Sequence, residues 1–322
     1  MAQDRITILF VDDEEAVVKT LRAIFRFDHN VLTATSGAEA LELLKIRNVH
    51  VIVSDQRMPG MSGLQLLTKV REISPNTIRI LLTGFSDLAA IVGSVNEGEV
   101  FRFISKPWNH AEIKSIVGQA ASIATQTAGI AVQHTGQTLA TAPDPSGAPP
   151  APLFISQHLL VLDDDPLIAQ AVRKLFDNVL EVHAAGSLSQ ALSVLQQEDV
   201  SVLVSDLRVN GEDLRPFLRI LKQRYPLIQA VLTTGMVDSD EIINLINKAQ
   251  IYRFTSKPLS YGALKLSVAA AMRQHAVYAE HPELLVRHQV EAFRPEEEKP
   301  SLVSSILASL QSIKKRFGLI NH

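Results

Sequence analysis

Two sets of acidic, hydroxyl and lysine side chains occur in this sequence, and the second set follows the first at a constant offset of 151 residues. Each set has an acidic pair, a later aspartate, a threonine and a lysine. The residues are Asp12, Asp13, Asp55, Thr83 and Lys106 in the first set, and Asp163, Asp164, Asp206, Thr234 and Lys257 in the second. A period this long exceeds those of solenoid and propeller repeats, so it indicates a duplicated domain.

The residue types in each set suit phosphoryl chemistry. Three carboxylates brought to one point repel one another, which raises their pKa values, and a divalent cation removes that conflict. Mg²⁺ is the natural choice because it binds a few carboxylates together with waters and phosphate oxygens. A lysine and a threonine would compensate the oxygens of a phosphoryl group in transfer. The remaining carboxylate is then a candidate nucleophile that forms an aspartyl phosphate.

The segments between these residues alternate between short apolar runs and amphipathic stretches. In the first copy we expect strands at 6–11, 49–54, 78–82 and 100–104, and helices at 14–27, 63–73, 87–96 and from His110 onward. Ser36 is expected to cap a further helix, with Glu39 as its capping-box partner. The second copy follows the same course over residues 159–278. Strict alternation predicts an α/β fold with a parallel sheet, in which ligands bind at the carboxyl ends of the strands.

Composition changes mark the domain boundaries. We expect a first domain at 1–125, a Pro/Ala-rich linker at 126–156, a second domain at 157–278, and a further linker with a C-terminal amphipathic helix at 279–322. Apolar residues in 301–317 alternate spacings of three and four, as in a helix with one apolar face. This helix could dock onto its own domain or pair with another chain as a dimer, and the sequence leaves both open.

The bulk composition excludes several classes of function. The chain has 322 residues, a net charge of −3 and no cysteine, so thiol catalysis and thiolate metal sites are excluded and a nucleic-acid partner is not expected. No apolar stretch reaches membrane-spanning length, and a cytoplasmic location is expected. The ten histidines are scattered without metal-ligand spacing, which predicts surface or core positions for them.

Both copies resemble the receiver domain of bacterial two-component response regulators, over residues 4–125 and 157–278. The motifs are an acidic pair after strand one, Asp after strand three, Thr-Gly after strand four and Lys-Pro after strand five. The resemblance implies two flavodoxin-like, five-stranded (βα)5 domains. It also implies a cis peptide bond before Pro107 and Pro258.

The resemblance assigns a role to each motif residue. Asp55 and, by position, Asp206 would accept a phosphoryl group from a sensor histidine kinase or a phosphotransfer protein. Threonine and lysine of each copy would grip the phosphoryl oxygens. The resemblance implies that Mg²⁺ is bound by Asp12, Asp13, Asp55 and the backbone carbonyl of Arg57 in the first copy, and by Asp163, Asp164, Asp206 and the backbone carbonyl of Arg208 in the second. It also implies that Phe103 and Phe254 are the switch aromatics of the two copies.

The predicted function is a phosphorelay response regulator that signals by protein–protein interaction with an unidentified target. It is not expected to be an enzyme beyond promoting its own phosphorylation and slow autodephosphorylation. Three alternatives remain: one receiver as a phosphate sink, one receiver as an unphosphorylated scaffold, and an aspartyl-phosphate phosphohydrolase. The last is disfavoured because such enzymes place the nucleophile on strand one, whereas here the acid pair comes first.

The two copies differ beside the acceptor. The loop after Asp55 contains Pro59, whereas the equivalent position after Asp206 is Asn210, and this loss predicts a looser loop in the second copy. We therefore expect Asp55 to be the primary acceptor and Asp206 a slower one. Phe85 and Met236, two residues past each threonine, are expected to hinder water at the acyl phosphate.

Overall fold

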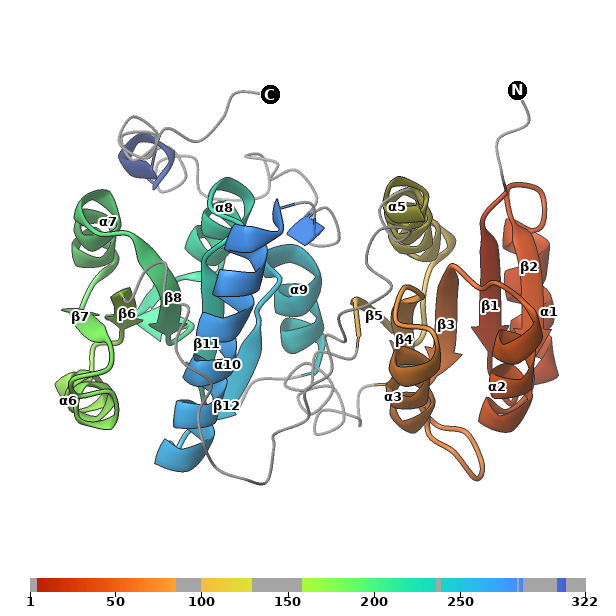
Figure 1. The fold of residues 1–322 in the computed structure, drawn as a ribbon, viewed down its shortest axis with the longest axis horizontal. Helices are drawn as coiled ribbons and strands as arrows, with labels where there is room; N and C mark the ends of the chain where they lie inside the picture. The colour runs from red at the N-terminus through yellow and green to blue at the C-terminus, as the bar shows by residue number, and fades with distance from the viewer. Residues whose placement is uncertain are drawn as a thin grey trace. The chain divides into compact units, whose positions relative to one another are not determined.

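The computed structural model describes residues 5–84, 100–128, 158–235, 239–282, 284–285 and 306–310. The chain divides into two compact units, the first mainly of residues 1–151 and the second mainly of residues 152–322. Each unit contains one five-stranded sheet with helices on both faces (Figure 1). Among the described helices, none is both long enough and apolar enough to cross a bilayer. The residues that repeat in the sequence therefore belong to two copies of the same fold.

The first unit has an entirely parallel sheet with the strand order β2-β1-β3-β4-β5. This is the flavodoxin-like order, and its switch point lies between β1 and β3. The elements are β1 (Thr7–Val11), α1 (Glu15–Phe25), β2 (Asn30–Ala34), α2 (Gly37–Ile46), β3 (Val51–Asp55), α3 (Gly63–Ile73), β4 (Ile78–Thr83), β5 (Arg102–Ser105) and α5 (His110–Ala128). The expected helix at 87–96 lies outside the described residues.

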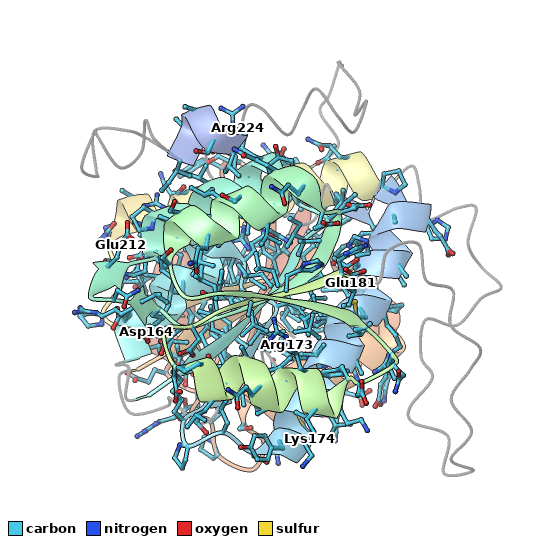
Figure 2. All side chains as sticks on the ribbon, turned by 90° about the vertical axis from the view of Figure 1, so that its left-hand side faces the viewer. Asp164, Arg173, Lys174, Glu181, Glu212 and Arg224 are labelled. Carbon is cyan, nitrogen blue, oxygen red and sulfur yellow. The ribbon has the colours of Figure 1, made fainter. Side chains whose placement is uncertain are left out.

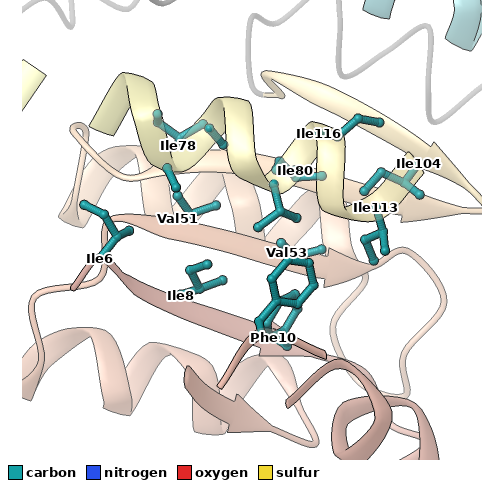
Figure 3. Close-up of a cluster of buried hydrophobic side chains, with 14 of the residues drawn as sticks. Ile6, Ile8, Phe10, Val51, Val53, Ile78, Ile80, Ile104, Ile113 and Ile116 are labelled. Atoms are coloured by element: carbon teal, nitrogen blue, oxygen red, sulfur yellow. The ribbon is translucent and has the colours of Figure 1, made fainter. Parts of the chain in front are cut away.

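Helices α1 and α5 cover one face of this sheet. The core between them and the strands includes Ile8 and Phe10 of β1, Val53 of β3 and Ile113 of α5, all at 0% exposure (Figure 3). The Phe10 ring stacks on Phe25 of α1 at a centroid distance of 5.2 Å. Each such side chain contributes roughly 1.5 to 3 kcal/mol when fully buried, so the strands and their carboxyl ends are held in fixed positions.

The opposite face is closed by α2 and α3, whose starts are capped. The Ser36 hydroxyl accepts a hydrogen bond from the Glu39 N–H at 3.2 Å, so the predicted N-cap of α2 is confirmed. The Glu39 carboxylate, however, accepts from the Thr35 N–H rather than from that of Ser36. At α3, a Cβ added to Gly63 would lie 2.1 Å from the Asp55 carbonyl oxygen. Only glycine lets α3 begin this close to the end of β3.

The second unit repeats the connectivity, with the parallel order β12-β11-β8-β6-β7. Helices α6 and α10 cover one face, as α1 and α5 do in the first unit. The main elements are β6 (His158–Leu162), α6 (Pro166–Leu175), β7 (Glu181–Ala185), α7 (Leu188–Gln197), β8 (Val200–Ser205), α8 (Arg215–Arg224), β11 (Gln229–Thr234), α9 (Ser239–Ala249), β12 (Arg253–Ser256) and α10 (Tyr261–Glu280).

The loop after Asp206 differs from the expectation of a looser segment. Strands β9 (Arg208–Val209) and β10 (Glu212–Asp213) pair as an antiparallel hairpin. Asn210 and Gly211 connect them with φ angles of 51° and 77°. Asn-Gly is the preferred pair for such a two-residue turn because both residues tolerate positive φ. The prediction of a loosened loop was therefore wrong, since the second copy forms a hairpin with Asn210 at the position that Pro59 has in the first copy.

The C-terminal segment packs on the second unit where it is described, at residues 306–310. These residues are helical, and Ile306 and Leu310 are 0% and 2% exposed. The Tyr225 hydroxyl donates to the Leu310 carbonyl at 2.6 Å, and Gln196 donates to the Ser309 carbonyl at 3.0 Å. Of the two placements considered for the tail helix, docking onto its own chain is the one observed for these residues. The rest of 301–317 lies outside the described residues.

Candidate functional site

Asp12, Asp55 and Lys106 come together at the carboxyl end of the first sheet. The Lys106 Nζ lies 2.8 Å from a carboxylate oxygen of Asp12 and 2.5 Å from one of Asp55. Both aspartates are buried, with 1% and 5% exposure. Residues distant in sequence meet here because β1 and β3 are neighbours at the switch point and Lys106 follows β5. The sequence-based expectation that these three would converge is confirmed.

Backbone amides fix the orientation of the two aspartates. The Glu14 N–H donates to Asp12 Oδ1 at 3.0 Å, and the Arg57 N–H donates to Asp55 Oδ2 at 2.7 Å. Thr83 is buried, at 1% exposure, and lies one register position beyond Leu82, which pairs with Asp55. Its hydroxyl is therefore at the edge of the sheet where the carboxylates meet. Asp13, in contrast, is exposed beside this edge.

The charges of this cluster do not balance. Burial raises the pKa of Asp55, and the nearby Asp12 charge adds to the rise, whereas Lys106 and the Arg57 N–H oppose it. Burial alone would lower the pKa of Lys106, but its contacts with Asp12 and Asp55 outweigh burial and raise it. Lysine is thus held as the ammonium ion, and it is one cation facing the three carboxyl groups of Asp12, Asp13 and Asp55. Such a donor set fits a divalent cation with oxygen ligands.

The second unit repeats this arrangement at the carboxyl end of its own sheet. The Lys257 Nζ lies 3.0 Å from Asp163 and 2.5 Å from Asp206. The Asp165 N–H donates to Asp163 Oδ1 at 3.0 Å, just as Glu14 does to Asp12. The contacts with Asp163 and Asp206 outweigh burial and raise the pKa of Lys257. Thr234 ends β11, and its side chain lies outside the described residues.

Two features separate the second site from the first. The Asp206 side chain is 20% exposed, compared with 7% for Asp55. The exposed Asp164 accepts a hydrogen bond from the Asn210 N–H at 2.7 Å, and the Asn210 side chain donates to the Gly186 carbonyl at 2.6 Å. The hairpin thus donates a hydrogen bond to a carboxylate that the resemblance assigned to the metal. Sequence reasoning missed this contact, although the Asn-Gly pair was a signal for the hairpin that makes it.

The remaining predicted residues lie where the motif places them. Phe103 and Phe254 are buried, at 0% and 3% exposure, on the strands that precede the two lysines. Both Lys-Pro peptide bonds, before Pro107 and before Pro258, are cis, as the resemblance implied. Phe85 and Met236, expected to shield the acyl phosphate from water, lie outside the described residues.

Comparison with known proteins agrees with the geometry. The family description "Response regulator receiver domain" matches residues 8–118 and 159–269. The hydrogenase transcriptional regulatory protein HoxA of Bradyrhizobium diazoefficiens is 37% identical over 134 residues, which are 40% of this chain and 28% of that protein. The DNA-binding transcriptional regulator NtrC of Escherichia coli is 36% identical over 113 residues, which are 35% of this chain and 24% of that protein.

Among solved structures, the signal receiver domain of an HD domain-containing protein from Pseudomonas fluorescens Pf-5 is similar. It is 35% identical with a TM-score of 0.36, and the match covers 38% of this chain and 98% of that one. The chain spans about a quarter of the length of the curated relatives, 28% of HoxA and 24% of NtrC. Both matched segments contain the aspartate pair, the later aspartate and the lysine. The chain therefore belongs to the response regulators of two-component systems, with two tandem receiver domains of the flavodoxin-like fold.

Proposed function

We propose that this protein is a phosphorylation-switched response regulator that accepts a phosphoryl group on Asp55 and, more slowly, on Asp206. The observation that carries this proposal is the contact of one lysine with two aspartates, made by Lys106 in the first unit and by Lys257 in the second. The donor is a sensor histidine kinase or a phosphotransfer protein. The output is a protein–protein interaction with a target that the chemistry of the site does not identify.

The reaction at Asp55 is a transfer between two residues. A carboxylate oxygen of Asp55 attacks the phosphorus of the donor's phosphohistidine, the P–N bond breaks, and the electron pair returns to the imidazole. Lys106 balances negative charge on the phosphoryl oxygens, and Thr83 offers them a hydroxyl hydrogen. Asp12, Asp13, Asp55 and the Arg57 carbonyl would hold Mg²⁺, which supplies further charge compensation when bound. Slow hydrolysis of the acyl phosphate returns Asp55 to the carboxylate.

The acyl phosphate then acts as a switch. It adds roughly 1.5 to 2 negative charges at Asp55. These charges draw Lys106 and Thr83 toward the phosphoryl oxygens and alter the space next to the buried Phe103. Inverting a 1:99 population requires about 5.5 kcal/mol of differential stabilisation, which a few charge-assisted hydrogen bonds can supply. We propose that Phe254 responds in the same way to Asp206.

The exposure of Asp206 favours a second role for the second receiver. An acyl phosphate on a side chain that is 20% exposed is more open to water than one on Asp55. Such a receiver would take up phosphoryl groups and lose them quickly, as a phosphate sink does. If Asp206 is never phosphorylated, the second receiver is instead a scaffold. A phosphohydrolase is the weakest candidate because the nucleophile here ends the third strand rather than the first.

Intact-mass measurement after incubation with acetyl phosphate and Mg²⁺ tests the proposal. We expect the wild-type chain to gain up to two phosphoryl groups, Asp206→Asn to gain one rapidly, and Asp55→Asn to gain one more slowly. The double variant should gain none, because the amide cannot act as the nucleophile. Undiminished phosphorylation of the double variant would refute both acceptor assignments. Equal rates in the two single variants would refute only the ranking.

Replacing the hairpin by the loop of the first receiver should raise the reactivity of Asp206. In Val209→Met/Asn210→Pro, proline cannot adopt the φ of 51° and has no N–H to donate, so the Asp164 carboxylate is released. A hydrogen bond to a charged group is worth about 1.5 to 3 kcal/mol. We therefore expect the Mg²⁺ concentration for half-maximal phosphorylation of Asp206 to fall about tenfold or more.

Asn210→Gly is the matched control because it keeps both the N–H and the positive φ. It should leave the Mg²⁺ requirement close to that of the wild-type chain. If the control and the loop replacement shift the requirement equally, the Asp164 contact is not what limits the second site.

A further inference from the structure

His158, His183 and Glu198 form a cluster in the second unit that the sequence did not predict. The His158 Nδ1 and His183 Nε2 lie 2.9 Å apart, and the two rings stack at a centroid distance of 5.2 Å. The Glu198 Oε2 lies 3.7 Å from His158 Nδ1, and one nitrogen from each ring and one oxygen from Glu198 all fall within 4.8 Å of one another. The two histidines are 25 residues apart in the sequence, so their spacing gave no sign of this cluster.

A fourth donor reaches the same two nitrogens. The Glu181 carboxylate places one oxygen 3.8 Å from His158 Nδ1 and the other 3.8 Å from His183 Nε2. Zinc binds imidazole nitrogen and carboxylate oxygen at about 2.0 to 2.2 Å, so neighbouring donors of a tetrahedral site are about 3.3 to 3.6 Å apart. The separations of His158 Nδ1 from its three neighbouring donors, and of His183 Nε2 from Glu181, are 2.9 to 3.8 Å, and the ligand atoms of His183 and Glu198 lie within 4.8 Å of each other. A cation can therefore enter with small side-chain movements.

The fold holds these donors together. His158 begins β6 and is the register partner of Glu181 on the parallel strand β7, and His183 lies two residues further along β7. Glu198 is the C-cap residue of α7, whose N–H is bonded to the Val194 carbonyl. The His183 and His158 side chains are 17% and 25% exposed, so the cluster is accessible from solvent and sheltered on one side.

The cluster is separate from the phosphoryl-acceptor site. Figure 2 shows Glu181 and Asp164 at opposite ends of the second sheet. It is also confined to one of the two copies. The positions of the first unit at the same offset are Thr7, Asn30, Leu32 and Arg47, of which none is a ligand of this kind. The duplicated fold therefore does not require these side chains.

We propose that His158, His183 and Glu198, with Glu181 as a fourth donor, bind a late first-row divalent cation of the Zn²⁺ type. Two imidazoles with carboxylates suit such a cation, whereas Mg²⁺ prefers oxygen ligands alone. Without a cation, one ring donates a hydrogen bond to the other. With a cation, both facing nitrogens contribute lone pairs, and the donor ring carries its proton on its other nitrogen. The bound cation joins β6, β7 and the end of α7, which stabilises the second unit.

Calorimetric titration of the full chain with Zn²⁺, in excess Mg²⁺ so that the acidic pockets are occupied, tests the proposal. We expect one Zn²⁺ per wild-type chain, and an affinity at least about 100-fold lower in His158→Gln/His183→Gln, since even the loss of a supporting contact around a metal can cost that much. Titration with Co²⁺ should give the visible absorption of a low-symmetry site in the wild-type chain but not in His158→Gln/His183→Gln. Glu198→Gln should weaken binding by a smaller factor.

His29→Gln/His110→Gln is the matched control because it removes two histidines of the first unit. It should bind Zn²⁺ as the wild-type chain does, and Zn²⁺ should raise its melting temperature equally. Wild-type chain that binds no Zn²⁺, or that binds it as tightly after the His158→Gln/His183→Gln change, would overturn the proposal. The pair would then be a hydrogen bond between neighbouring strands.

Discussion

Lys106→Met should destabilise the first unit by about 3 kcal/mol at neutral pH, because the substitution leaves two buried carboxylates without their counter-charge. Lys106 Nζ lies within 2.8 Å of Asp12 and 2.5 Å of Asp55, and both carboxylates are less than 10% exposed. Methionine preserves most of the aliphatic stem and removes only the charge. The same variant should lose most of its phosphorylation at Asp55, since the phosphoryl oxygens lose their lysine.

The cause of the destabilisation predicts how it can be reversed. Burial already raises the pKa of Asp55, and removal of the ammonium group should raise it further. A carboxyl whose pKa is higher in the folded chain than in the unfolded chain binds more protons when folded, so stability increases as the pH falls. The stability of Lys106→Met should therefore recover as the pH falls through the raised pKa of Asp55 toward the lower pKa that this carboxyl has in the unfolded chain. Mg²⁺ should restore it at neutral pH.

Denaturation of the full chain with hydrogen-exchange mass spectrometry assigns the loss to one unit. The added substitution Asp12→Asn should recover most of the stability without Mg²⁺. Lys257→Met is the matched variant of the second unit, and its effect should be smaller because Asp206 is 20% exposed. If Lys106→Met is as stable as the wild-type chain in the absence of Mg²⁺, the two buried carboxylates do not need the Lys106 charge to be stable.

The site was predictable from sequence because its residues follow strands whose patterns are unambiguous. β3 is buried at every position, and the apolar run before Asp55 indicates a strand that is covered on both faces of the sheet. β2 illustrates the opposite case. It lies at the sheet edge, its first residue is exposed and its middle residues are half-buried, so its sequence carries no clear period and gave no bounds. A strand could be located from the sequence where its burial gave a clear hydrophobic pattern, and could not be located where half-buried positions blurred that pattern.

Contacts that depend on neighbouring strands were not predictable in the same way. His158 and His183 are 25 residues apart and meet only through the register of β6 and β7. The bond between Asp164 and the Asn210 N–H likewise joins two loops that follow different strands. Local spacing rules apply within one helix or one hairpin, whereas these pairs are set by the sheet. The metal and phosphoryl chemistry that depends on these contacts therefore could not be predicted without the register of the strands.

The burial of Lys222 on α8 is another feature that sequence did not indicate. A lysine in the last turn of a helix is ordinarily solvated, yet this side chain is only 5% exposed. Its Nζ donates to the Pro226 carbonyl at 2.9 Å. Burial lowers the pKa of Lys222 to about 7. At the equivalent position of the first unit, Arg71 is exposed.

Lys222→Met should stabilise the second unit by about 3 kcal/mol at pH 7. The unfolded chain has a lysine pKa of about 10.4, so between the folded value of about 7 and this value the unfolded state binds the extra proton. Stability of the wild-type chain therefore rises with pH across this window, by up to about 1.4 kcal/mol per pH unit, and the full cost of charging Lys222 is felt below it. Removal of the amine abolishes that cost, less about 1 kcal/mol for the lost hydrogen bond.

Urea denaturation at pH 7, 8 and 9, followed in the second unit by hydrogen exchange, measures the effect. The wild-type chain should gain stability across this series, whereas Lys222→Met should start higher and gain much less. Arg71→Met is the matched control, and as an exposed substitution it should change stability by no more than about 0.5 kcal/mol at any of these pH values. Parallel pH profiles of the wild-type chain and Lys222→Met would mean that the Lys222 amine remains charged when the second unit is folded. The packing around α8 would then have to accommodate an ammonium ion that donates to the Pro226 carbonyl.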